Sequence, residues 1–405
     1  MPDDPHQPTP DPPTLAPTQS RIQVDRAALR ANLKAFRDRL APNGRIAAVV
    51  KKDAYGLGID QVVPTLLDQG VEALAVYSAD EAEALLTTAP DIPIITLGPI
   101  DRLPADSALR HAAQQGRLEP TLHTLEQLSD LEQAAKAVGR KLRVHIYLDT
   151  GMSRSGFDAQ GFKTAVTRVL ASLSVGLAGL HTHLATADGD PSFARQQLDA
   201  YLRACDHLAA TTPLPETTLR HVANSYASLR DTAYHLDMIR PGLGLCGCGY
   251  DDLIDQPRLT TTDPLTPVVR WLTPIHHVAT YPANTPVGYG STWTTPSPRT
   301  LAVVPIGYGD GYPVALSNKA SMRVRLPDGQ HLDAPVRGRV NMDQVVIDIT
   351  DFTGNPKHLL GATVEAISAD KNAPNTVPRL AKLAGTHSYE ILCRLSPVIP
   401  RLAIN

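Results

Sequence analysis

A lysine that leads into a glycine-punctuated turn is the most chemically suggestive feature of this 405-residue chain. The apolar segment 46–50 runs directly into Lys51, and Tyr55 follows four residues later. Lysine is strongly hydrated, so its amine is costly at the end of a buried strand unless it is neutralised, paired or covalently bound. A covalent bond to an aldehyde cofactor would remove that cost. The alternative interpretation is a surface lysine that follows an edge strand.

A second group of candidate residues stands where two later strand-like runs end. Asn224 and Ser225 follow the first run, and Arg240, Gly242 and Leu243 follow the second. Glycine allows backbone amides to approach an anion closely. The pattern therefore indicates a site for a phosphate group beside a permanently charged guanidinium.

The elements that must position these residues alternate in a regular way. Short apolar runs recur eight times, and helix-like stretches separate many of them, as expected for parallel strands with crossover helices. This predicts an α/β fold, a (β/α)8 TIM-type barrel, whose active site lies at the carboxyl ends of its strands. The eight runs are 46–50, 73–77, 92–97, 118–122, 142–148, 175–184, 219–223 and 236–239. At or just beyond the ends of five of them stand Lys51, Asp149, His183, Asn224 with Ser225, and Arg240.

Beyond residue 264 the chain changes to alternating, turn-rich segments, which predict a β-rich C-terminal domain. We expect the barrel to span residues 20–262 and the second domain to span 263–405. Residues 1–19 contain seven prolines and few large apolar groups, so we expect a disordered tail there.

Composition narrows the class of ligand. The 38 basic and 41 acidic residues give a formal net charge of −3, which does not favour nucleic acid or an anionic membrane as a partner. No apolar run approaches the roughly eighteen residues of a membrane span, and the start of the chain does not resemble a secretory leader. We expect a cytoplasmic protein with a small-molecule ligand.

The segments around the candidate residues resemble, in place and order, motifs of the alanine racemase family of fold-type III, pyridoxal-phosphate-dependent racemases. The resemblance covers residues from about 22 to 401 and implies that Lys51 carries pyridoxal 5'-phosphate. Arg240 would face the pyridine nitrogen, where its fixed charge favours removal and return of a proton. The residues that the resemblance assigns to cofactor binding are Lys51, Tyr55, Arg154, His183, Asn224, Ser225, Arg240, Gly242, Leu243 and Tyr389.

The same resemblance implies a two-base interconversion of L-alanine and D-alanine, with Lys51 on one face of the α-carbon and Tyr289 on the other, supplying D-alanine for peptidoglycan. A phenol titrates near 10, so Tyr289 needs a hydrogen-bond chain, through His183 towards Arg240. In the family, the second domain of one subunit completes the site of the other, which implies a homodimer with shared active sites. The residues assigned to substrate binding are Arg154, Tyr308, Met342 and Asp343.

Four residues depart from the commoner family pattern. Tyr147 stands where many relatives carry a carbamylated lysine that braces the arginine, and Tyr226, Asn341 and His387 also differ. Such changes can widen or polarise a pocket, so a racemase of broader specificity, for serine for example, is an alternative.

Two alternatives belong to other classes of enzyme. His181 and His183 could bind a metal with His221, His235 and Asp237, which would make the protein a metal-dependent hydrolase on a TIM barrel. That interpretation leaves Lys51 and the phosphate-type glycines without a role. The segment 242–247 also matches the dinucleotide fingerprint, but it lies late in the chain and does not open a long helix.

Overall fold

The computed structural model describes residues 19–89, 91–100, 103–104, 107–249, 265–326 and 328–405. The tail expected over residues 1–19 lies outside the described residues except for its last one, and so does the expected boundary between residues 262 and 263. Within the described ranges, no helix combines the length and the apolar character needed to cross a membrane.

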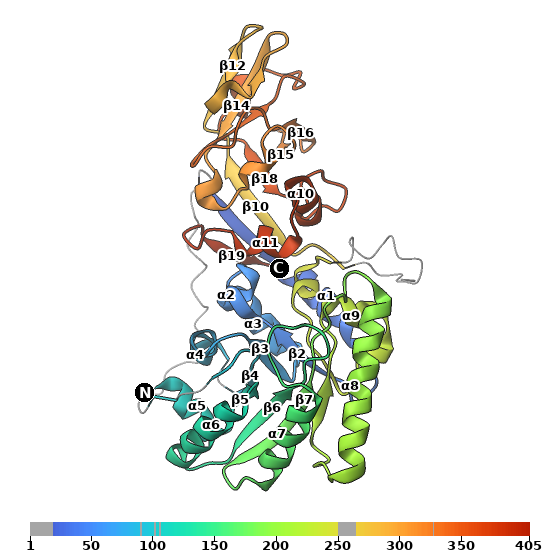
Figure 1. Ribbon diagram of the computed structural model, residues 1–405. Helices are drawn as coiled ribbons and strands as arrows, with labels where there is room; N and C mark the ends of the chain where they lie inside the picture. Colours follow the sequence, from blue (N-terminus) through green and yellow to red (C-terminus); the bar gives the residue numbers. More distant parts are fainter. Residues whose placement is uncertain (1–18, 90, 101–102, 105–106, 250–264, 327) are drawn as a thin grey trace, which may run out of the picture.

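Eight parallel strands form a nearly closed barrel, as predicted, in the lower part of Figure 1. Neighbouring strands pair in chain order, and β9 pairs with β2 at the start of the series. Between β9 and β8 the Arg240 amide donates to the Ala223 carbonyl at 2.8 Å, just beyond the strand ends. The strands are β2 (Arg45–Val49), β3 (Ala73–Val76), β4 (Ile94–Thr96), β5 (Leu118–Leu122), β6 (Leu142–Tyr147), β7 (Val175–His181), β8 (Leu219–His221) and β9 (Met238–Ile239).

Helices follow or precede most of these strands and pack around the barrel (Figure 1). Local capping fixes several of their ends: Ser78 and Glu81 form a capping box at α4, and Gly139 ends α6 in the left-handed conformation. The helices of this part are α1 (Arg26–Arg37), α2 (Lys51–Tyr55), α3 (Ile59–Asp68), α4 (Ala79–Thr88), α5 (Ala108–Gln115), α6 (Leu125–Val138), α7 (Ala159–Ala171), α8 (Pro191–Thr211) and α9 (Ser225–Arg230).

The C-terminal part is rich in β-structure, as predicted, and extends away from the barrel to the tip that carries β12 (Figure 1). Its main sheet has the order β16-β15-β18-β10-β1-β19, and a smaller sheet has the order β11-β14-β17. The strands are β10 (Val269–Pro274), β11 (His277–Tyr281), β12 (Pro286–Val287), β13 (Trp293–Thr294), β14 (Arg299–Val304), β15 (Ser321–Arg325), β16 (His331–Pro335), β17 (Val345–Asp348), β18 (Thr363–Ile367) and β19 (Arg401–Ile404). Two helices, α10 (Val377–Ala384) and α11 (Ser388–Cys393), lie among them.

The first described strand, β1 (Arg21–Asp25), corrects part of the expected domain range. It pairs antiparallel with β10 and parallel with β19, so it belongs to the C-terminal sheet although the range 20–262 was assigned to the barrel. Ile22 and Val24 are buried, while Arg21, Gln23 and Asp25 are only partly covered. That alternation suits a sheet with one buried face better than a barrel strand covered on both faces.

Candidate active site

Lys51 lies at the carboxyl end of β2, where it begins the short helix α2. Partial burial lowers the pKa of its amine, and the nearby charge of Arg154 lowers that pKa further. Within the described part of the chain, the amine forms neither a hydrogen bond nor an ion pair at contact distance. A lowered pKa increases the neutral, nucleophilic fraction of an amine, so Lys51 is suited to attack a carbonyl.

The turn after Lys51 has an unusual backbone. Lys52, Asp53, Ala54 and Tyr55 all have φ between 52° and 58°, which makes one turn of left-handed helix from residues that are not glycine. Such a conformation costs about 1–2 kcal/mol per residue. Neighbouring contacts hold it: the Glu81 carboxylate accepts from the Lys52 amide at 3.1 Å and pairs with the Lys52 amine at 3.0 Å. Backbone strain of this kind gathers at functional sites.

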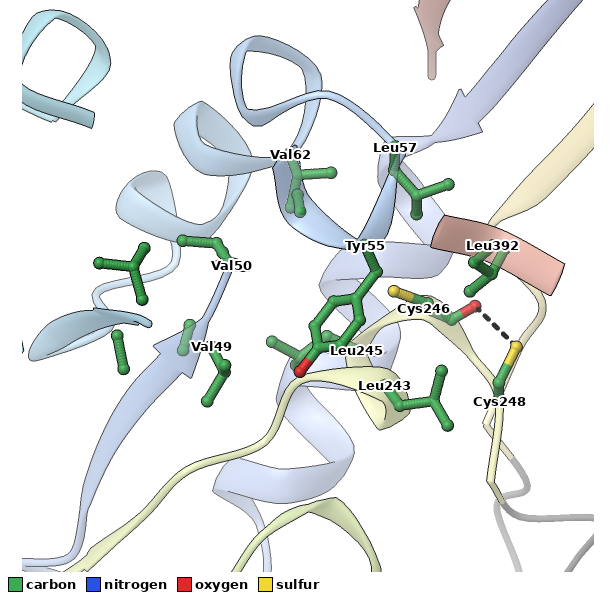
Figure 2. Close-up of a cluster of buried hydrophobic side chains, with 14 of the residues drawn as sticks. Val49, Val50, Tyr55, Leu57, Val62, Leu243, Leu245, Cys246, Cys248 and Leu392 are labelled. Carbon is green, nitrogen blue, oxygen red and sulfur yellow. Dashed lines mark hydrogen bonds between the residues drawn. The ribbon is translucent and has the colours of Figure 1, made fainter. Parts of the chain in front are cut away.

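This turn points the Tyr55 ring into an apolar cluster built from the barrel and the C-terminal part. Figure 2 shows the ring among Leu243, Leu245 and Cys246, with Leu392 of α11 nearby. The Tyr389 ring, also from α11, lies 5.8 Å from the Tyr55 ring. Both tyrosines that were predicted to bind the cofactor are therefore neighbours at one side of the barrel mouth.

Gly242 leaves room for the Tyr55 hydroxyl. A Cβ atom at Gly242 would lie 2.2 Å from that oxygen, so no larger residue fits without displacing the tyrosine. Ser225 lies on the other side of Gly242, and its Oγ accepts hydrogen bonds from the amides of Gly242 at 2.9 Å and Gly244 at 3.0 Å. The serine O–H remains as a donor towards a ligand. The Leu243 amide opens a 3-10 helix and so has no acceptor within that helix.

Asn224 is an N-cap rather than a free ligand group in this structure. Its side-chain oxygen accepts from the Ala227 amide at 3.0 Å and so fixes the start of α9, where Ser225 is the first residue. The structure thus shows how Asn224 positions Ser225, while direct contact with a cofactor stays a prediction.

Arg240 is 4% exposed and is held by neutral groups. Its Nη1 donates to the His221 Nδ1 at 2.7 Å and the His221 carbonyl at 2.8 Å, and its Nη2 donates to the Thr182 carbonyl at 2.9 Å. Burial lowers its pKa to about 10, which leaves it charged at neutral pH. Because the terminal nitrogens are engaged with the protein, the Nε–H is the donor that remains for a ligand.

His183 lies two residues beyond β7, close to these cations. Burial lowers its pKa to about 3, and the charges of Arg240, Arg154 and Lys51 act in the same direction. The imidazole is therefore neutral at neutral pH. The hydrogen bond of Arg240 to an imidazole goes to His221, so the expected link between His183 and Arg240 is not a direct hydrogen bond.

Arg154 follows β6 in a loop shaped by Asp149, whose carboxylate accepts from the amides of Gly151 at 2.9 Å and Met152 at 2.7 Å. The Arg154 side chain is exposed in the single chain. Tyr147 lies beneath it, nearly fully buried, and its ring stacks on His181 with a centroid distance of 4.9 Å. Burial raises the pKa of the Tyr147 phenol, and the positive charge of Arg154 opposes that rise.

The remaining predicted residues form a separate group on the C-terminal part. Tyr289 is 72% exposed, Tyr308 is 46% exposed and Met342 is 54% exposed, which is unusual for large apolar side chains. The Tyr308 amide donates to the Asn341 carbonyl at 3.0 Å, which joins the tyrosine loop to the segment that carries Met342 and the exposed Asp343. No interaction among the described residues links this group to Lys51 of the same chain.

Three of the residues proposed as metal ligands have other partners. His221 bonds Arg240, the His235 ring contacts the Ser228 carbonyl at 2.8 Å, and Asp237 pairs with Arg220 at 3.1 Å. No cluster of three potential metal-binding side chains occurs among the residues that the structure describes.

Sequence reasoning missed the residues behind Arg240, namely Glu119 and His145. They lie within the runs 118–122 and 142–148, where a polar residue inside an otherwise apolar strand was the available signal. Their neighbours come from other strands, so only the fold brings them together.

A parallel barrel with a partly buried lysine and a glycine-containing turn at its mouth, followed by a β-rich region, agrees with the class of two-domain amino-acid racemases, which are isomerases. Residues 24–249 match the model for the N-terminal domain of alanine racemase, and residues 268–403 match the model for its C-terminal domain. The chain therefore belongs to the alanine racemase family.

Full-length relatives agree with that assignment. The alanine racemase of Synechocystis sp. is 36% identical over 388 residues, covering 95% of this chain and 98% of the relative. The crystal structure of alanine racemase from a D-cycloserine-producing Streptomyces lavendulae superposes with a TM-score of 0.82 at 29% identity, covering 96% and 98% of the two chains. Alanine racemase from Bartonella henselae, solved with covalently bound pyridoxal phosphate, gives a TM-score of 0.79 at 27% identity and covers 96% of this chain and 100% of that one.

Proposed function

We propose that this protein interconverts L-alanine and D-alanine with pyridoxal 5'-phosphate bound to Lys51. One observation carries the proposal: a partly buried amine with a lowered pKa and no bonding partner among the described residues stands at the mouth that Ser225 and Gly242 line. The solved Bartonella relative, with its covalently bound pyridoxal phosphate, supports the same chemistry.

The residues at the mouth fit that cofactor. The Ser225 O–H, the Leu243 amide and the hydroxyls of Tyr55 and Tyr389 supply neutral donors for a phosphate group. The Nε–H of Arg240 supplies a charged donor for the ring nitrogen. The absent side chain of Gly242 admits the Tyr55 hydroxyl, so the site is shaped as well as charged.

The bound cofactor would withdraw electrons from the α-carbon of the substrate and so make its proton removable. The protein must then supply two proton carriers, one on each face. The Lys51 amine serves one face, because its lowered pKa makes its proton easier to release than that of an ordinary lysine. Arg154 offers a planar fork of donors suited to the substrate carboxylate.

The second proton carrier comes from another copy of the chain. Tyr289, Tyr308, Met342 and Asp343 share one exposed region, and no interaction among the described residues joins it to Lys51 of the same chain. We infer a homodimer in which the partner subunit's Tyr289 faces Lys51 across the substrate. The exposure of Tyr289, at 72%, is the observation that supports this assembly.

His183 would serve the phenol as a neutral hydrogen-bond partner. A pKa of about 3 keeps its imidazole unprotonated, so it can accept from the tyrosine without adding a further charge beside Arg240. This role orients the phenol and does not store the transferred proton.

The test combines spectrum and activity in one sample. The purified protein, loaded with pyridoxal phosphate, should absorb visible light, lose that absorption on treatment with borohydride, and cause L-alanine to lose its optical rotation. L-serine, tested in parallel, measures whether the pocket discriminates a hydroxyl. A protein that binds the cofactor but leaves both amino acids unchanged would refute racemisation while keeping the cofactor site.

A further inference from the structure

A line of hydrogen bonds runs behind Arg240 into the interior of the barrel. Arg240 contacts His221 at 2.7 Å, the His221 Nε2 lies 2.8 Å from the His145 Nδ1, and the His145 Nε2 lies 3.1 Å from a Glu119 carboxylate oxygen. The two imidazoles are fully buried, and Glu119 is 6% exposed. These four residues, which we call the Arg240–Glu119 chain, come from β5, β6, β8 and the end of β9.

The hydrogen bonds of the Arg240–Glu119 chain can run in only one donor-to-acceptor direction. A guanidinium has only donors, so the His221 Nδ1 must accept, and the His221 Nε2 must then carry the hydrogen that it donates to the His145 Nδ1. The His145 Nε2 must in turn donate to the Glu119 carboxylate, which has only acceptors. A single set of tautomers, both neutral and protonated at Nε2, satisfies every bond.

The Arg240–Glu119 chain also connects two groups of opposite charge. Among the described residues, Arg240 has no carboxylate within ion-pair distance, and the acid at the far end of the chain is Glu119. Burial acts to raise the pKa of Glu119, but the hydrogen bond from His145 and the charges of Arg143 and Arg45 outweigh it and keep the carboxylate ionised. Burial and the charge of Arg240 lower the pKa of His221 well below its usual value, so its ring stays neutral between them.

The strand between the two histidines is shaped to let them meet. His145 is on β6 and His221 is on β8, so their bond must pass over β7. The β7 residue at the crossing is Gly179, where a Cβ atom would lie 2.5 Å from the His145 Nδ1. Any larger residue would intrude on the nitrogen that accepts the bond from His221.

We infer that Glu119 and His145 are positioning residues for Arg240, fixing the His221 tautomer that accepts from the guanidinium and so holding the Arg240 Nε–H towards the mouth. This inference rests on the proposed function, in which Arg240 faces the cofactor ring. Without an acceptor at position 119, the His145 ring can reverse its tautomer, and a donor on His221 would then face a donor on Arg240.

Three variants of the holoenzyme separate the parts of this inference. Glu119→Leu removes the acceptor, whereas Glu119→Gln keeps an acceptor oxygen for His145 and removes the charge. Thr121→Val is the matched control, since Thr121 is buried on the same strand and face and its hydroxyl has no partner among the described residues.

We expect Glu119→Leu to lower kcat on the order of 10- to 100-fold with KM almost unchanged, as for the outer carboxylates of metal-bound histidines. It should also shift the visible absorption of the bound cofactor. Glu119→Gln should retain more activity than Glu119→Leu, and Thr121→Val should resemble the parent protein. Equal behaviour of Glu119→Leu and Thr121→Val in kcat and spectrum would overturn the inference.

Nitrogen NMR of histidine-labelled protein without cofactor gives an independent result. The parent and Glu119→Gln should show His145 and His221 protonated at Nε2, and Glu119→Leu should show a different tautomer for at least one ring. Unchanged tautomers in Glu119→Leu would contradict the inference even if the activity falls. If the parent protein neither binds pyridoxal phosphate nor racemises alanine, the proposed function fails, and the tautomer result still tests the chain.

Discussion

The barrel mouth and the exposed group on the C-terminal part differ in how completely one chain builds them. At the mouth, Arg240 is 4% exposed and bonded to carbonyl groups and an imidazole, and Tyr55 is enclosed by apolar side chains (Figure 2). On the C-terminal part, Tyr289 is 72% exposed, and the glycines on either side of it lie close to residues 338–339 and 292 of the same region.

The difference separates two requirements of the proposed reaction. A cofactor must be held tightly in one geometry, and groups fixed by packing and hydrogen bonds provide that. A second proton carrier must approach the opposite face of the substrate, and a side chain supplied by another copy can do so once the copies assemble. In the proposed reaction, cofactor binding therefore falls to the barrel, and completion of the site falls to the inferred dimer.

Replacing Lys51 should abolish the contribution of the barrel mouth to the reaction. Lys51→Ala removes the group that would hold the cofactor and one of the two proton carriers, so racemisation should fall by at least about a thousandfold. The visible absorption of the cofactor-loaded protein should disappear as well. Racemisation assays and absorption spectra of both proteins measure these effects.

Lys34→Ala is the control, because Lys34 is an exposed lysine on α1 that pairs with Asp38 at 2.5 Å. It should keep the absorption band. A Lys51→Ala protein with an unchanged band would refute the assignment of Lys51 as the cofactor lysine.

Replacing Tyr289 should abolish the contribution of the C-terminal part to proton transfer while leaving cofactor binding intact. Tyr289→Phe removes only the phenolic oxygen, and loss of a proton carrier lowers rates by about 10²- to 10⁴-fold. Exchange of the α-proton with deuterated solvent, followed separately for L-alanine and D-alanine, should be lost much more for one enantiomer. The absorption band should remain.

Tyr281→Phe provides a matched change on β11 of the same part of the chain. Its exchange rates should equal those of the parent for both enantiomers. Equal loss for the two enantiomers in Tyr289→Phe would contradict a one-sided role for the phenol.

Mixing the Lys51→Ala and Tyr289→Phe variants tests whether the two proton carriers of one active site come from different copies of the protein. If Lys51→Ala and Tyr289→Phe chains exchange freely, about half of the dimers are mixed, and each mixed dimer has one intact site. Activity should therefore return to about a quarter of the parent value after joint unfolding and refolding. Absence of recovery, with both chains shown to co-assemble by pull-down of a tagged copy, would place both bases in one chain.

The sequence predicted the residues at the barrel mouth better than it predicted which strands pair. Lys51, His183 and Arg240 could be placed because each follows an apolar run, and parallel strands bring their carboxyl ends to one face. The partners of β1 could not be foreseen, since β10 and β19 lie far along the chain and local alternation does not name a pairing partner.

Two other features of the site could not be predicted from the sequence, for different physical reasons. The left-handed turn at 52–55 violates the local preference of four residues, and only contacts such as that of Glu81 with Lys52 stabilise it. The bond of His145 to His221 crosses an intervening strand over Gly179, so it depends on strand order and on a missing side chain.

The comparison also predicts where acid should act on stability. His181 is buried in the barrel between the rings of Tyr147 and His221, and burial together with the charge of Arg240 holds its pKa well below the usual 6.5. The unfolded chain therefore binds a proton below about pH 6.5 that the folded barrel does not bind, and the free energy of unfolding falls as the pH drops. Between pH 7 and pH 5 one such histidine accounts for at most about 2 kcal/mol.

Replacing the imidazole by an uncharged ring should remove that contribution. Between pH 7 and pH 5 the free energy of unfolding of His181→Phe should fall less than that of the parent, by up to about 2 kcal/mol, as measured by urea unfolding of the apo-protein at each pH. His277→Phe, at an exposed position on β11, controls for the added aromatic ring and should keep the parent's dependence on pH. A parent-like pH dependence in His181→Phe would show that acid destabilises the protein through groups other than His181. The burial of His181 between Tyr147 and His221 would then have no measurable effect on the free energy of unfolding.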